Sequence, residues 1–371
     1  MAELQAAIVG STGYSGQELT RILFQHPRLK PPLLLSREGE GSASEIVSPV
    51  DGSAVALHPF SWRGMHQHGV DLLFLATPHE VARAWVPEAL DRGLRVIDLS
   101  GAWRLQTVEY AKVYGFHDIG SPQAVAIQQK AVYGMPELRR EELPEAQLVA
   151  NPGCYPISVI LALAPLMAAS LVDLRFGVVC DCKSGVSGAG KAPTPQTHFV
   201  ETAENFRAYS AFTHRHAGEV LEQLHLEPGE LAFSTHLLPI RRGILSSIYA
   251  HLKRPVTSAD LEHCLRDYYY SSPFVRIVAP PRLPEVQHTQ HTNFCDLGWV
   301  LAPDRQRVML VSCIDNLIKG AAGQAVQNMN LMYGWGECEG LMPAIPSRAR
   351  ARSSVYFGPA AHVGVAAGVT P

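Results

Sequence analysis

A cysteine lies between a glycine and an apolar run that is long enough to form a helix. Cys154 follows residues 151–153 (Asn-Pro-Gly), Pro156 comes two positions later, and residues 157–169 are rich in Leu and Ala. Proline is favoured at a helix start because it has no N–H to leave unpaired and its φ is already helical. We therefore expect Cys154 at or just before a helix N-terminus, where free N–H groups and the helix dipole favour a thiolate. This pattern is typical of a nucleophilic cysteine; a buried cysteine at a loop-to-helix junction is the alternative.

Two histidines are candidates for the acid–base group that such a nucleophile needs. Residues 208–216 (AYSAFTHRH) are expected to form a strand, in which His214 and His216 share one face because alternate side chains do so. Imidazole accepts and donates protons near neutral pH. We place His216 first and His214 second, and the alternative is that both only hydrogen-bond their neighbours.

A glycine-rich turn follows the first expected strand. Residues 6–9 are apolar, and residues 17–25 have apolar side chains at helical spacing. A strand, a glycine-rich turn and a helix in this order form the context of dinucleotide binding, although the spacing is G-x-x-G-x-x-G instead of G-x-G-x-x-G. The turn is expected to hold a pyrophosphate at the helix N-terminus. Its residues are Gly10, Ser11, Thr12, Gly13, Tyr14, Ser15 and Gly16.

The second expected strand, residues 32–35, ends at a hydroxyl and a guanidinium. An acidic side chain usually follows this strand where NAD is preferred, because it binds the ribose hydroxyls. Ser36 and Arg37 stand there instead and suit a 2′-phosphate, so we predict NADP(H) as cofactor. The alternative is that Arg37 is a solvated loop charge beside Glu38.

Two further apolar runs, residues 70–76 and 94–99, are separated by a helical pattern over residues 80–92. This is a βαβ unit and predicts a parallel sheet, whose ligands bind beyond the carboxyl ends of the strands. Thr77, Pro78 and Ser100 follow those ends and are predicted to contact the cofactor.

The second half of the chain changes pattern. Residues 176–183 and 244–252 read as strands with few helices between them, and the small-residue loop 184–191 offers N–H groups and a lysine to an anion. We predict an α/β protein with an N-terminal Rossmann-type domain and an α+β catalytic or dimerisation domain. The expected parts are a nucleotide domain (1–150), a catalytic domain (151–315), a helix returning to the first domain (316–335) and a peripheral tail (336–371). Within the nucleotide domain, residues 100–150 are expected to be rich in loops.

Composition excludes several classes of protein. The chain has 47% apolar and 18% charged residues, a net charge of −3 and a pI near 6.6. It therefore lacks the excess of positive charge that is typical of proteins that bind nucleic acid or an anionic membrane. Seven scattered cysteines indicate a reducing compartment, and no second Cys/His pair accompanies Cys180 and Cys182, so we expect no metal site. No signal peptide or membrane span is recognisable, and we expect a cytoplasmic protein.

A series of different short motifs occurs between residues 6 and 335. They are GSTGYSG (10–16), SR (36–37), ATPH (76–79), DLS (98–100), YGMPEL (133–138), NPGCYP (151–156), KSGVSGAGK (183–191), HRH…E (214–219), HLLPIRRG (236–243) and DNLIKGAAGQA (315–325). Together they resemble the N-acetyl-γ-glutamyl-phosphate reductase family, which is related to aspartate-semialdehyde dehydrogenase. Where that family usually has a DFRL-like run, this chain has GAWRL (101–105), and Ala217-Gly218 replaces the usual Thr-Pro after HRH.

The resemblance implies NADPH-dependent reduction of an acyl phosphate to an aldehyde, with phosphate release, in arginine biosynthesis. Cys154 would form a thioester and His216 or His214 would move the protons. The resemblance also implies association into a homodimer or homotetramer through the sheet of the second domain. The remaining candidate site residues are assigned to two ligands. The substrate is expected to bind to Arg104, Asn151, Lys191 and Arg242, and the cofactor to Ser187, Gly188 and Asn316.

Two alternatives to this function stay open at the level of sequence. The same chemistry suits another acyl phosphate, such as a carrier-linked aminoadipyl phosphate of lysine biosynthesis or aspartyl phosphate. A non-catalytic NADP-binding regulator is the other, although such a relative is expected to have lost Cys154 or the histidine pair, and both are present.

Overall fold

The computed structural model describes residues 3–36 and 44–342. Arg37, which was predicted to bind the cofactor, and the tail beyond residue 342 lie outside the described residues. The described residues up to Leu341 belong to one unit, and the following paragraphs concern that unit alone.

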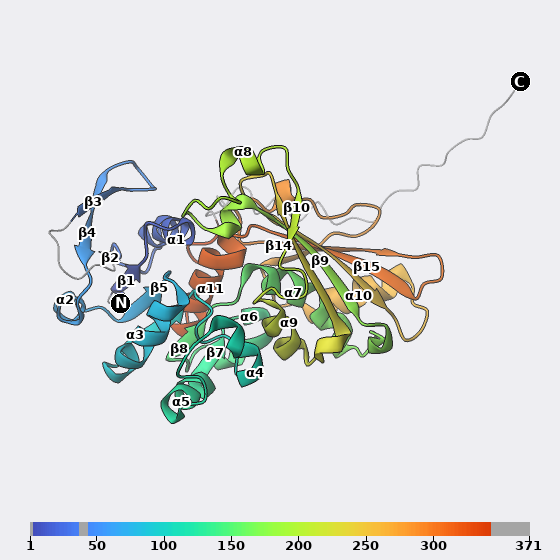
Figure 1. The fold of residues 1–371 in the computed structure, drawn as a ribbon, viewed down its shortest axis with the longest axis horizontal. Helices are drawn as coiled ribbons and strands as arrows, with labels where there is room; N and C mark the ends of the chain where they lie inside the picture. Colours follow the sequence, from blue (N-terminus) through green and yellow to red (C-terminus); the bar gives the residue numbers. More distant parts are fainter. Residues whose placement is uncertain (1–2, 37–43, 343–371) are drawn as a thin grey trace, which may run out of the picture. The chain divides into compact units, whose positions relative to one another are not determined.

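The first half of the chain forms an eight-stranded sheet (Figure 1). Its strands are β1 (Ala6–Val9), β2 (Leu33–Ser36), β3 (Ser44–Val47), β4 (Ala54–Pro59), β5 (Leu72–Leu75), β6 (Arg95–Asp98), β7 (Ala131–Tyr133) and β8 (Leu148–Ala150). They lie in the order β3-β4-β2-β1-β5-β6-β8-β7, and every pair is parallel except β3 with β4. The crossover order places the carboxyl ends of β1, β5 and β6 side by side.

Helices bury both faces of this sheet. The helices in this half of the chain are α1 (Tyr14–Phe24), α2 (Trp62–Gln67), α3 (His79–Asp91), α4 (Val108–Ala111), α5 (Pro122–Lys130) and α6 (Pro136–Arg139), and its 3₁₀ turns are η1 (Lys112–Tyr114) and η2 (Arg140–Glu142). Alternate residues of β1 enter two apolar clusters: Ile8 packs with α1, and Val9 packs with α3. Because a strand presents successive side chains to opposite faces, a sheet covered on both sides needs apolar residues at every position, as the run over residues 6–9 provides.

A seven-stranded sheet follows, in the order β10-β11-β9-β12-β15-β14-β13. Its strands are β9 (Val178–Gly185), β10 (Arg207–Tyr209), β11 (Leu231–Leu238), β12 (Ile244–His251), β13 (Val275–Ile277), β14 (Cys295–Leu301) and β15 (Arg307–Ile314). The helices α7 (Cys154–Ala168), α9 (Ala217–Leu224) and α10 (Ser258–Tyr268) join one face in a single apolar core. The remaining elements are α8 (Phe199–Thr202) and the 3₁₀ turns η3 (Leu174–Phe176), η4 (Val186–Ala189), η5 (Pro228–Glu230) and η6 (Val286–His288). The alternation of buried and more exposed residues along β11 and β12 shows that the residues described by the structure cover only one face.

The last part of the described chain returns to the first half. The π-helical turn η7 (Ile318–Ala322) and α11 (Gly323–Met332) enter the same apolar cluster as α1 and β1, and Figure 1 shows α11 beside α1 and β5. Residues 336–341 were expected to be peripheral, and this is wrong. Glu339 pairs with Arg28 at 2.7 Å, and Glu337 pairs with Arg140 at 2.8 Å. Leu341 packs against the apolar cluster that contains residues of α1 and β1.

The structure confirms the predicted fold class and corrects two local expectations. The strand predicted over residues 208–216 is wrong, because β10 ends at Tyr209 and the next residues turn. Ser210 and Phe212 have positive φ (45° and 61°), which breaks an extended strand. His216 is instead the N-cap residue of α9. The stretch 100–150 is also less loop-rich than expected, since it contains α4, α5 and α6.

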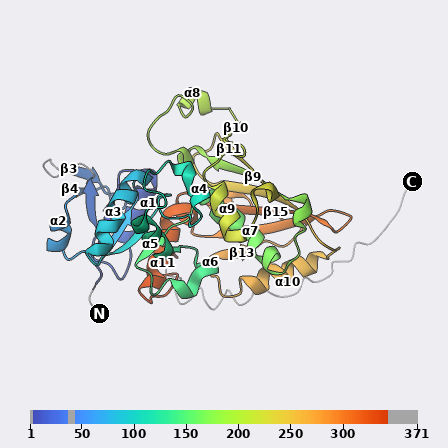
Figure 2. The same cartoon turned by 60° about the horizontal axis from the view of Figure 1, so that its bottom comes forward.

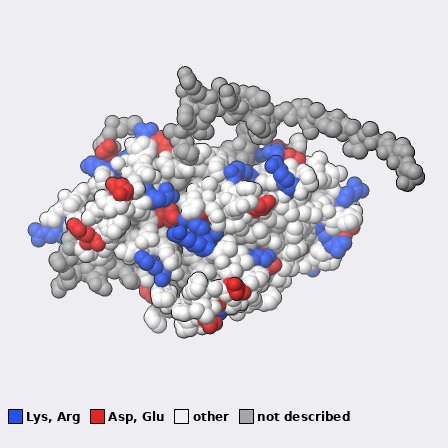
Figure 3. Space-filling view, turned by 90° about the horizontal axis from the view of Figure 1, so that it is seen from above, with Lys and Arg blue, Asp and Glu red and all other residues white. Residues whose placement is uncertain are grey.

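The surface carries both signs of charge. Lys and Arg side chains are interspersed with Asp and Glu over the face shown in Figure 3. Figure 2 shows α8 at the tip of an excursion from the second sheet. Among the helices of ranges 3–36 and 44–342, none combines the length and the apolar character needed to cross a bilayer.

Candidate active site

A cavity of about 540 Å³ opens where the glycine-rich turn, the ends of β5 and β6 and the start of α7 meet. Fourteen predicted site residues line it: Gly13, Tyr14, Ser15, Gly16, Thr77, Pro78, Ser100, Arg104, Cys154, Ser187, Gly188, Lys191, His216 and Asn316. Other predicted residues do not line it, namely Gly10, Ser11, Thr12, Ser36, Asn151, His214 and Arg242. Residues from both sheets therefore converge on one space.

Cys154 is the first residue of α7, and Gly153 is its N-cap with an extended backbone. A Cβ on Gly320 of η7 would lie 2.8 Å from the Cβ of Cys154, so the π-helical turn packs directly on the cysteine and requires a glycine there. Burial raises the pKa of the Cys154 thiol to about 11, and the nearby Arg104 guanidinium and the N–H of Tyr155 oppose this only in part. The expectation of a resting thiolate is therefore wrong, because loss of hydration outweighs the effect of the helix N-terminus.

A buried glutamate ties the cysteine loop to its surroundings. Oε2 of Glu219 accepts hydrogen bonds from the backbone N–H of Gly153 (2.9 Å) and from the hydroxyl of Tyr133 (2.8 Å). Its Oε1 accepts one from Nη1 of Arg104 at 3.1 Å. Arg104 also donates from Nε to the carbonyl of Asn151 at 2.7 Å. The carboxylate thus fixes both the loop before Cys154 and the arginine beside it.

His216 faces this cluster. Its Nε2 lies 3.5 Å from Nη1 of Arg104 and 4.0 Å from Oε1 of Glu219. Its Nδ1 is buried and has no hydrogen-bond partner among the residues that the structure describes. Burial, together with the charges of His214 and Arg104, lowers the pKa of His216 well below 6.5. The imidazole is therefore neutral at pH 7 and able to accept a proton.

His214 has a different environment. Its Nδ1 accepts a hydrogen bond from the backbone N–H of His216 at 3.1 Å. Its ring lies edge-on to Tyr155 and Tyr209, with centroid distances of 5.4 and 5.7 Å, and burial lowers its pKa to about 4. His214 thus supports the turn, whereas His216 lines the cavity.

The glycine-rich turn is tight enough to need its glycines. Gly10 has φ +89°, and a Cβ there would lie 2.3 Å from the carbonyl oxygen of Ala76. A Cβ on Gly16 would lie 2.1 Å from the oxygen of Gly10. The hydroxyls of Ser11 and Thr77 are buried without a hydrogen-bond partner in the described part of the chain. Close backbone approach and two unpaired hydroxyls fit the phosphate and ribose groups of a dinucleotide.

Another cavity, of about 290 Å³, also borders the glycine-rich turn. Its lining includes Ser11, Thr12, Ile46, Val47 and Lys191. Lys191 lines both cavities, and its Nζ donates to the carbonyl of Thr12 at 2.9 Å. Both spaces therefore border the turn, which fits a ligand as long as a dinucleotide.

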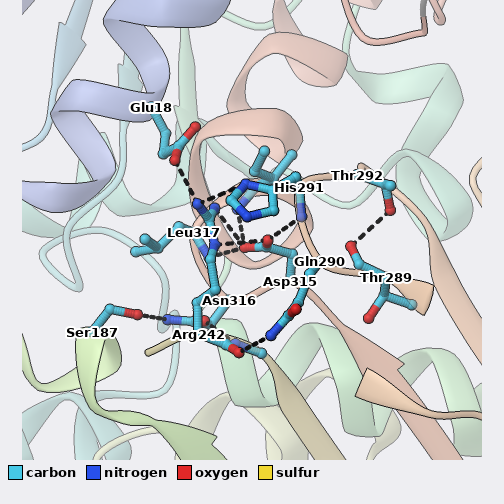
Figure 4. Close-up of polar contacts among 12 residues, drawn as sticks. Glu18, Ser187, Arg242, Thr289, Gln290, His291, Thr292, Asp315, Asn316 and Leu317 are labelled. Atoms are coloured by element: carbon cyan, nitrogen blue, oxygen red, sulfur yellow. Dashed lines mark hydrogen bonds and ion pairs between the residues drawn. The ribbon is translucent and has the colours of Figure 1, made fainter. Parts of the chain in front are cut away.

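Arg242 does not line the cavity, and its side chain takes part in a polar network (Figure 4). Its Nη1 donates to Oε1 of Glu18 at 2.6 Å and lies 3.1 Å from Nδ1 of His291, while Nη2 donates to Oδ1 of Asp315 at 2.9 Å. The guanidinium thereby joins α1 of the first half to the strand ends of the second sheet. The geometry gives no support to the predicted contact between Arg242 and substrate.

Asn316 and Asn151 also have protein partners at both ends of their amides. Oδ1 of Asn316 accepts from the N–H of Gly243 at 2.7 Å, and Nδ2 donates to Oγ of Ser187 at 3.0 Å (Figure 4). Asn151 donates to the carbonyl of Ala321 and accepts from Nδ2 of Asn328, each at 3.1 Å. Both side chains therefore hold the walls of the site in position.

The motifs contain Glu219, Tyr133 and Arg215, but sequence reasoning assigned none of them a role in the site. Glu219 follows His216 by one helical turn, so the spacing was visible, but an amphipathic helix also carries such a glutamate on its exposed face. Only the structure shows that its side chain is fully buried. Within ranges 3–36 and 44–342 no group of three or more His, Cys, Asp and Glu side chains is arranged to hold a metal ion.

In comparison with known proteins, both halves of the chain match family models of semialdehyde dehydrogenases. A family model described as "Semialdehyde dehydrogenase, NAD binding domain" matches residues 5–146, and one described as "Semialdehyde dehydrogenase, dimerisation domain" matches residues 154–316. A Bacillus subtilis protein named N-acetyl-gamma-glutamyl-phosphate reductase is 42% identical over 344 residues, or 91% of this chain and 98% of the relative. The protein of that name from Desulforapulum autotrophicum is 41% identical over 344 residues, with the same shares covered.

Solved structures share the fold. Aspartate semialdehyde dehydrogenase II of Vibrio cholerae, complexed with ASA, superposes with a TM-score of 0.68 at 19% identity, over 90% of this chain and 98% of that one. The Candida albicans aspartate semialdehyde dehydrogenase, solved with NADP, gives a TM-score of 0.65 at 13% identity, over 89% and 98%. The chain therefore belongs to the N-acetyl-gamma-glutamyl-phosphate reductase family of the semialdehyde dehydrogenases, and it is an oxidoreductase with a nicotinamide cofactor.

Proposed function

We propose that the chain reduces N-acetyl-γ-glutamyl phosphate to N-acetylglutamate 5-semialdehyde with NADPH, releasing phosphate, as a step of arginine biosynthesis in the cytoplasm. The observation that carries this proposal is the convergence of Cys154, His216 and the glycine-rich turn on one cavity. The names of the 41–42% identical relatives support the choice of substrate.

The first chemical step uses the thiol and the neutral imidazole. His216 accepts the proton of Cys154, and the resulting thiolate attacks the acyl carbon of the substrate. The bond from that carbon to the phosphate oxygen breaks, phosphate leaves, and a thioester remains on Cys154. The proton transfer is needed because the thiol of Cys154, with its pKa raised to about 11, is not ionised at neutral pH.

The second step reduces the thioester. The cofactor, when bound in the main cavity, would supply the hydride that the thioester carbon accepts. The protonated His216 gives its proton to the oxyanion that forms and takes it back when the C–S bond breaks, which frees the aldehyde and the thiolate of Cys154. N–H groups in the first turn of α7 have no intrahelical acceptor and are available to stabilise the oxyanion.

The cofactor would be held mainly by the first half of the chain. Residues 1–150 form the nucleotide-binding part in this proposal, residues 151–315 the catalytic part, and residues 316–335 the return to the first part. The turn Gly10–Gly16 would hold the pyrophosphate, and Thr77, Pro78, Ser100, Ser187 and Gly188, which line the main cavity, would contact the nicotinamide end. Ser36 and Arg37 would bind the 2′-phosphate. Arg37→Ala should weaken NADPH binding far more than NADH binding, and equal effects on both would refute that role.

Assembly is proposed through the open face of the second sheet. Val179, Tyr249 and Val300 are 44–46% exposed on that face, and they belong to three different strands. The matched family model is described as a dimerisation domain, and a second copy covering this face gives a homodimer, or a homotetramer when dimers pair. Tyr249→Glu should shift the mass measured by sedimentation towards the monomer; an unchanged mass would place the interface elsewhere.

The function is tested in the reverse direction. The protein should oxidise N-acetylglutamate 5-semialdehyde only when NADP⁺ and phosphate are both present. Aspartate semialdehyde and a carrier-linked aminoadipate semialdehyde serve as competing substrates in parallel assays. A higher kcat/KM with either competitor would replace the proposed substrate while leaving the mechanism in place.

A further inference from the structure

The charges that line the main cavity are mostly positive. Arg104, Lys191 and Arg215 line it, and Glu80 is the carboxylate in the lining that the structure describes. Glu80 pairs with Nε2 of His79 at 3.0 Å. The cavity is therefore suited to an anionic ligand, and the question is which cation is available to bind it.

Two of these cations already have acceptors inside the protein. Arg104 donates from Nε to Asn151, from Nη1 to Glu219 and from Nη2 to the carbonyl of Leu99. Lys191 donates to the carbonyl of Thr12. Both side chains hold the walls of the cavity together, which limits what they offer to a ligand.

Arg215 has no such acceptor. It forms no hydrogen bond or ion pair with any residue of ranges 3–36 and 44–342, and its side chain is exposed while the next residue, His216, is buried. Its positive charge reaches several groups around the cavity: it acts on the pKa values of His216, His79 and Cys154. The guanidinium is therefore near the cysteine and free to bind.

The geometry points to Arg215 as the residue that binds the phosphate group of the acyl phosphate. This inference rests on the proposed function. A guanidinium matches phosphate because its planar array of donors forms two parallel hydrogen bonds to two oxygens. The phosphate is bonded to the carbon that Cys154 attacks, so it must lie close to the sulfur, whereas three further carbons separate that carbon from the substrate's α-carboxylate.

The role of Arg215 concerns the negative charge that develops on the phosphate in the first chemical step. When the thiolate of Cys154 attacks, the C–O bond breaks and its electron pair stays on the phosphate oxygen. A guanidinium placed at that oxygen stabilises the charge that develops there. In the reverse direction Arg215 binds inorganic phosphate, and the bound phosphate then attacks the thioester.

The test separates the two anions of the reaction. In the oxidation of N-acetylglutamate 5-semialdehyde, Arg215→Gln should raise the KM for inorganic phosphate about 10–100-fold, as expected for loss of charge-assisted hydrogen bonds. The KM for the semialdehyde and the Kd for NADPH, measured by fluorescence, should stay within about twofold. Arg215→Lys should lie between Arg215→Gln and the wild type, because it keeps the charge and loses the paired donors. Arg282→Gln removes an exposed arginine outside the cavity and should change neither constant.

A second measurement does not depend on turnover. Inorganic phosphate should slow the alkylation of Cys154 by iodoacetamide in the wild type, and the Arg215→Gln variant should lose that protection. A rise in the KM for the semialdehyde instead of phosphate would reassign Arg215 to the carboxylate and overturn the inference, as would full phosphate protection in Arg215→Gln. A wild type that is protected by phosphate but does not oxidise the semialdehyde would refute the proposed substrate and leave the phosphate site standing.

Discussion

The backbone N–H of Gly153 donates a 2.9 Å hydrogen bond to Oε2 of Glu219, which joins the loop before the cysteine to the helix after His216. The two residues are 66 positions apart in the chain. A Cβ on Gly153 would lie 2.7 Å from Nε2 of His216 and 2.8 Å from Oε1 of Glu219, so a glycine is required for this approach. The relative position of Cys154 and His216 therefore depends on one buried carboxylate.

Glu219→Gln should destabilise the fold and reduce turnover. The substitution leaves the buried Arg104 without its counter-charge, and breaking a buried ion pair costs about 3–5 kcal/mol. The free energy of unfolding in urea and kcat should both fall. Glu262→Gln, which breaks an exposed pair with Arg266, should cost less than about 1 kcal/mol. Equal stability of the two variants would show that Glu219 does not carry the role assigned to it.

Cys154→Ala should abolish turnover while NADPH still binds. Without the sulfur no thioester can form, but the glycine-rich turn and its hydroxyls remain unchanged. Turnover is followed at 340 nm, a wavelength specific to reduced nicotinamide, and binding is followed by fluorescence. Substantial turnover in this variant would remove the thioester mechanism.

His216→Asn should lower kcat by about 10²–10⁴, the usual contribution of general acid–base catalysis. His214→Asn should have a smaller effect, because His214 lies outside the cavity lining and acts on the backbone of His216. Steady-state kinetics of the two variants give the comparison. A larger loss in His214→Asn would reverse the assignment.

Gly320→Ala should damage the site through packing alone. The added Cβ would lie 2.8 Å from the Cβ of Cys154, so the π-helical turn or the cysteine must shift. Overpacking of this kind typically costs about 1–3 kcal/mol, and kcat should fall with it. Gly229→Ala is the matched control, because its Cβ would meet no atom within 4 Å. The prediction fails if both variants keep wild-type kcat and the same unfolding midpoint.

The stability of the protein should fall in mild acid. Burial lowers the pKa of His214 to about 4 and that of His216 well below 6.5. Between pH 6.5 and about 4 the unfolded chain therefore binds more protons than the folded one, and the free energy of unfolding falls as pH falls. Each imidazole contributes at most about 1.4 kcal/mol per pH unit. Urea unfolding from pH 4.5 to 8 measures the slope, and His214→Asn should make it shallower; an unchanged slope would exclude His214 as a source.

Local patterns in the sequence determined the fold class and the position of Cys154 at a helix start. Short apolar runs at residues 6–9 and 72–75 favour strands buried on both faces, and glycines at 10 and 16 are required where the backbone turns this tightly. Proline, glycine and an apolar run likewise determined the helix that begins at Cys154. Each of these signals lies within about a dozen neighbouring residues, so backbone sterics and burial patterns suffice to interpret it.

Only the tertiary structure decided which polar side chains are buried and what they meet. Glu219 became the centre of the site through contacts with Arg104 and Tyr133, more than 80 positions away in the chain. Arg242, which the motifs assigned to substrate, became a connection between Glu18 and Asp315. The protonation state of Cys154 also depended on the tertiary structure, because hydration is lost only when the halves of the chain close around the sulfur. Contacts between distant residues and the loss of water around a charge are properties of the folded chain, and no local pattern of residues encodes them.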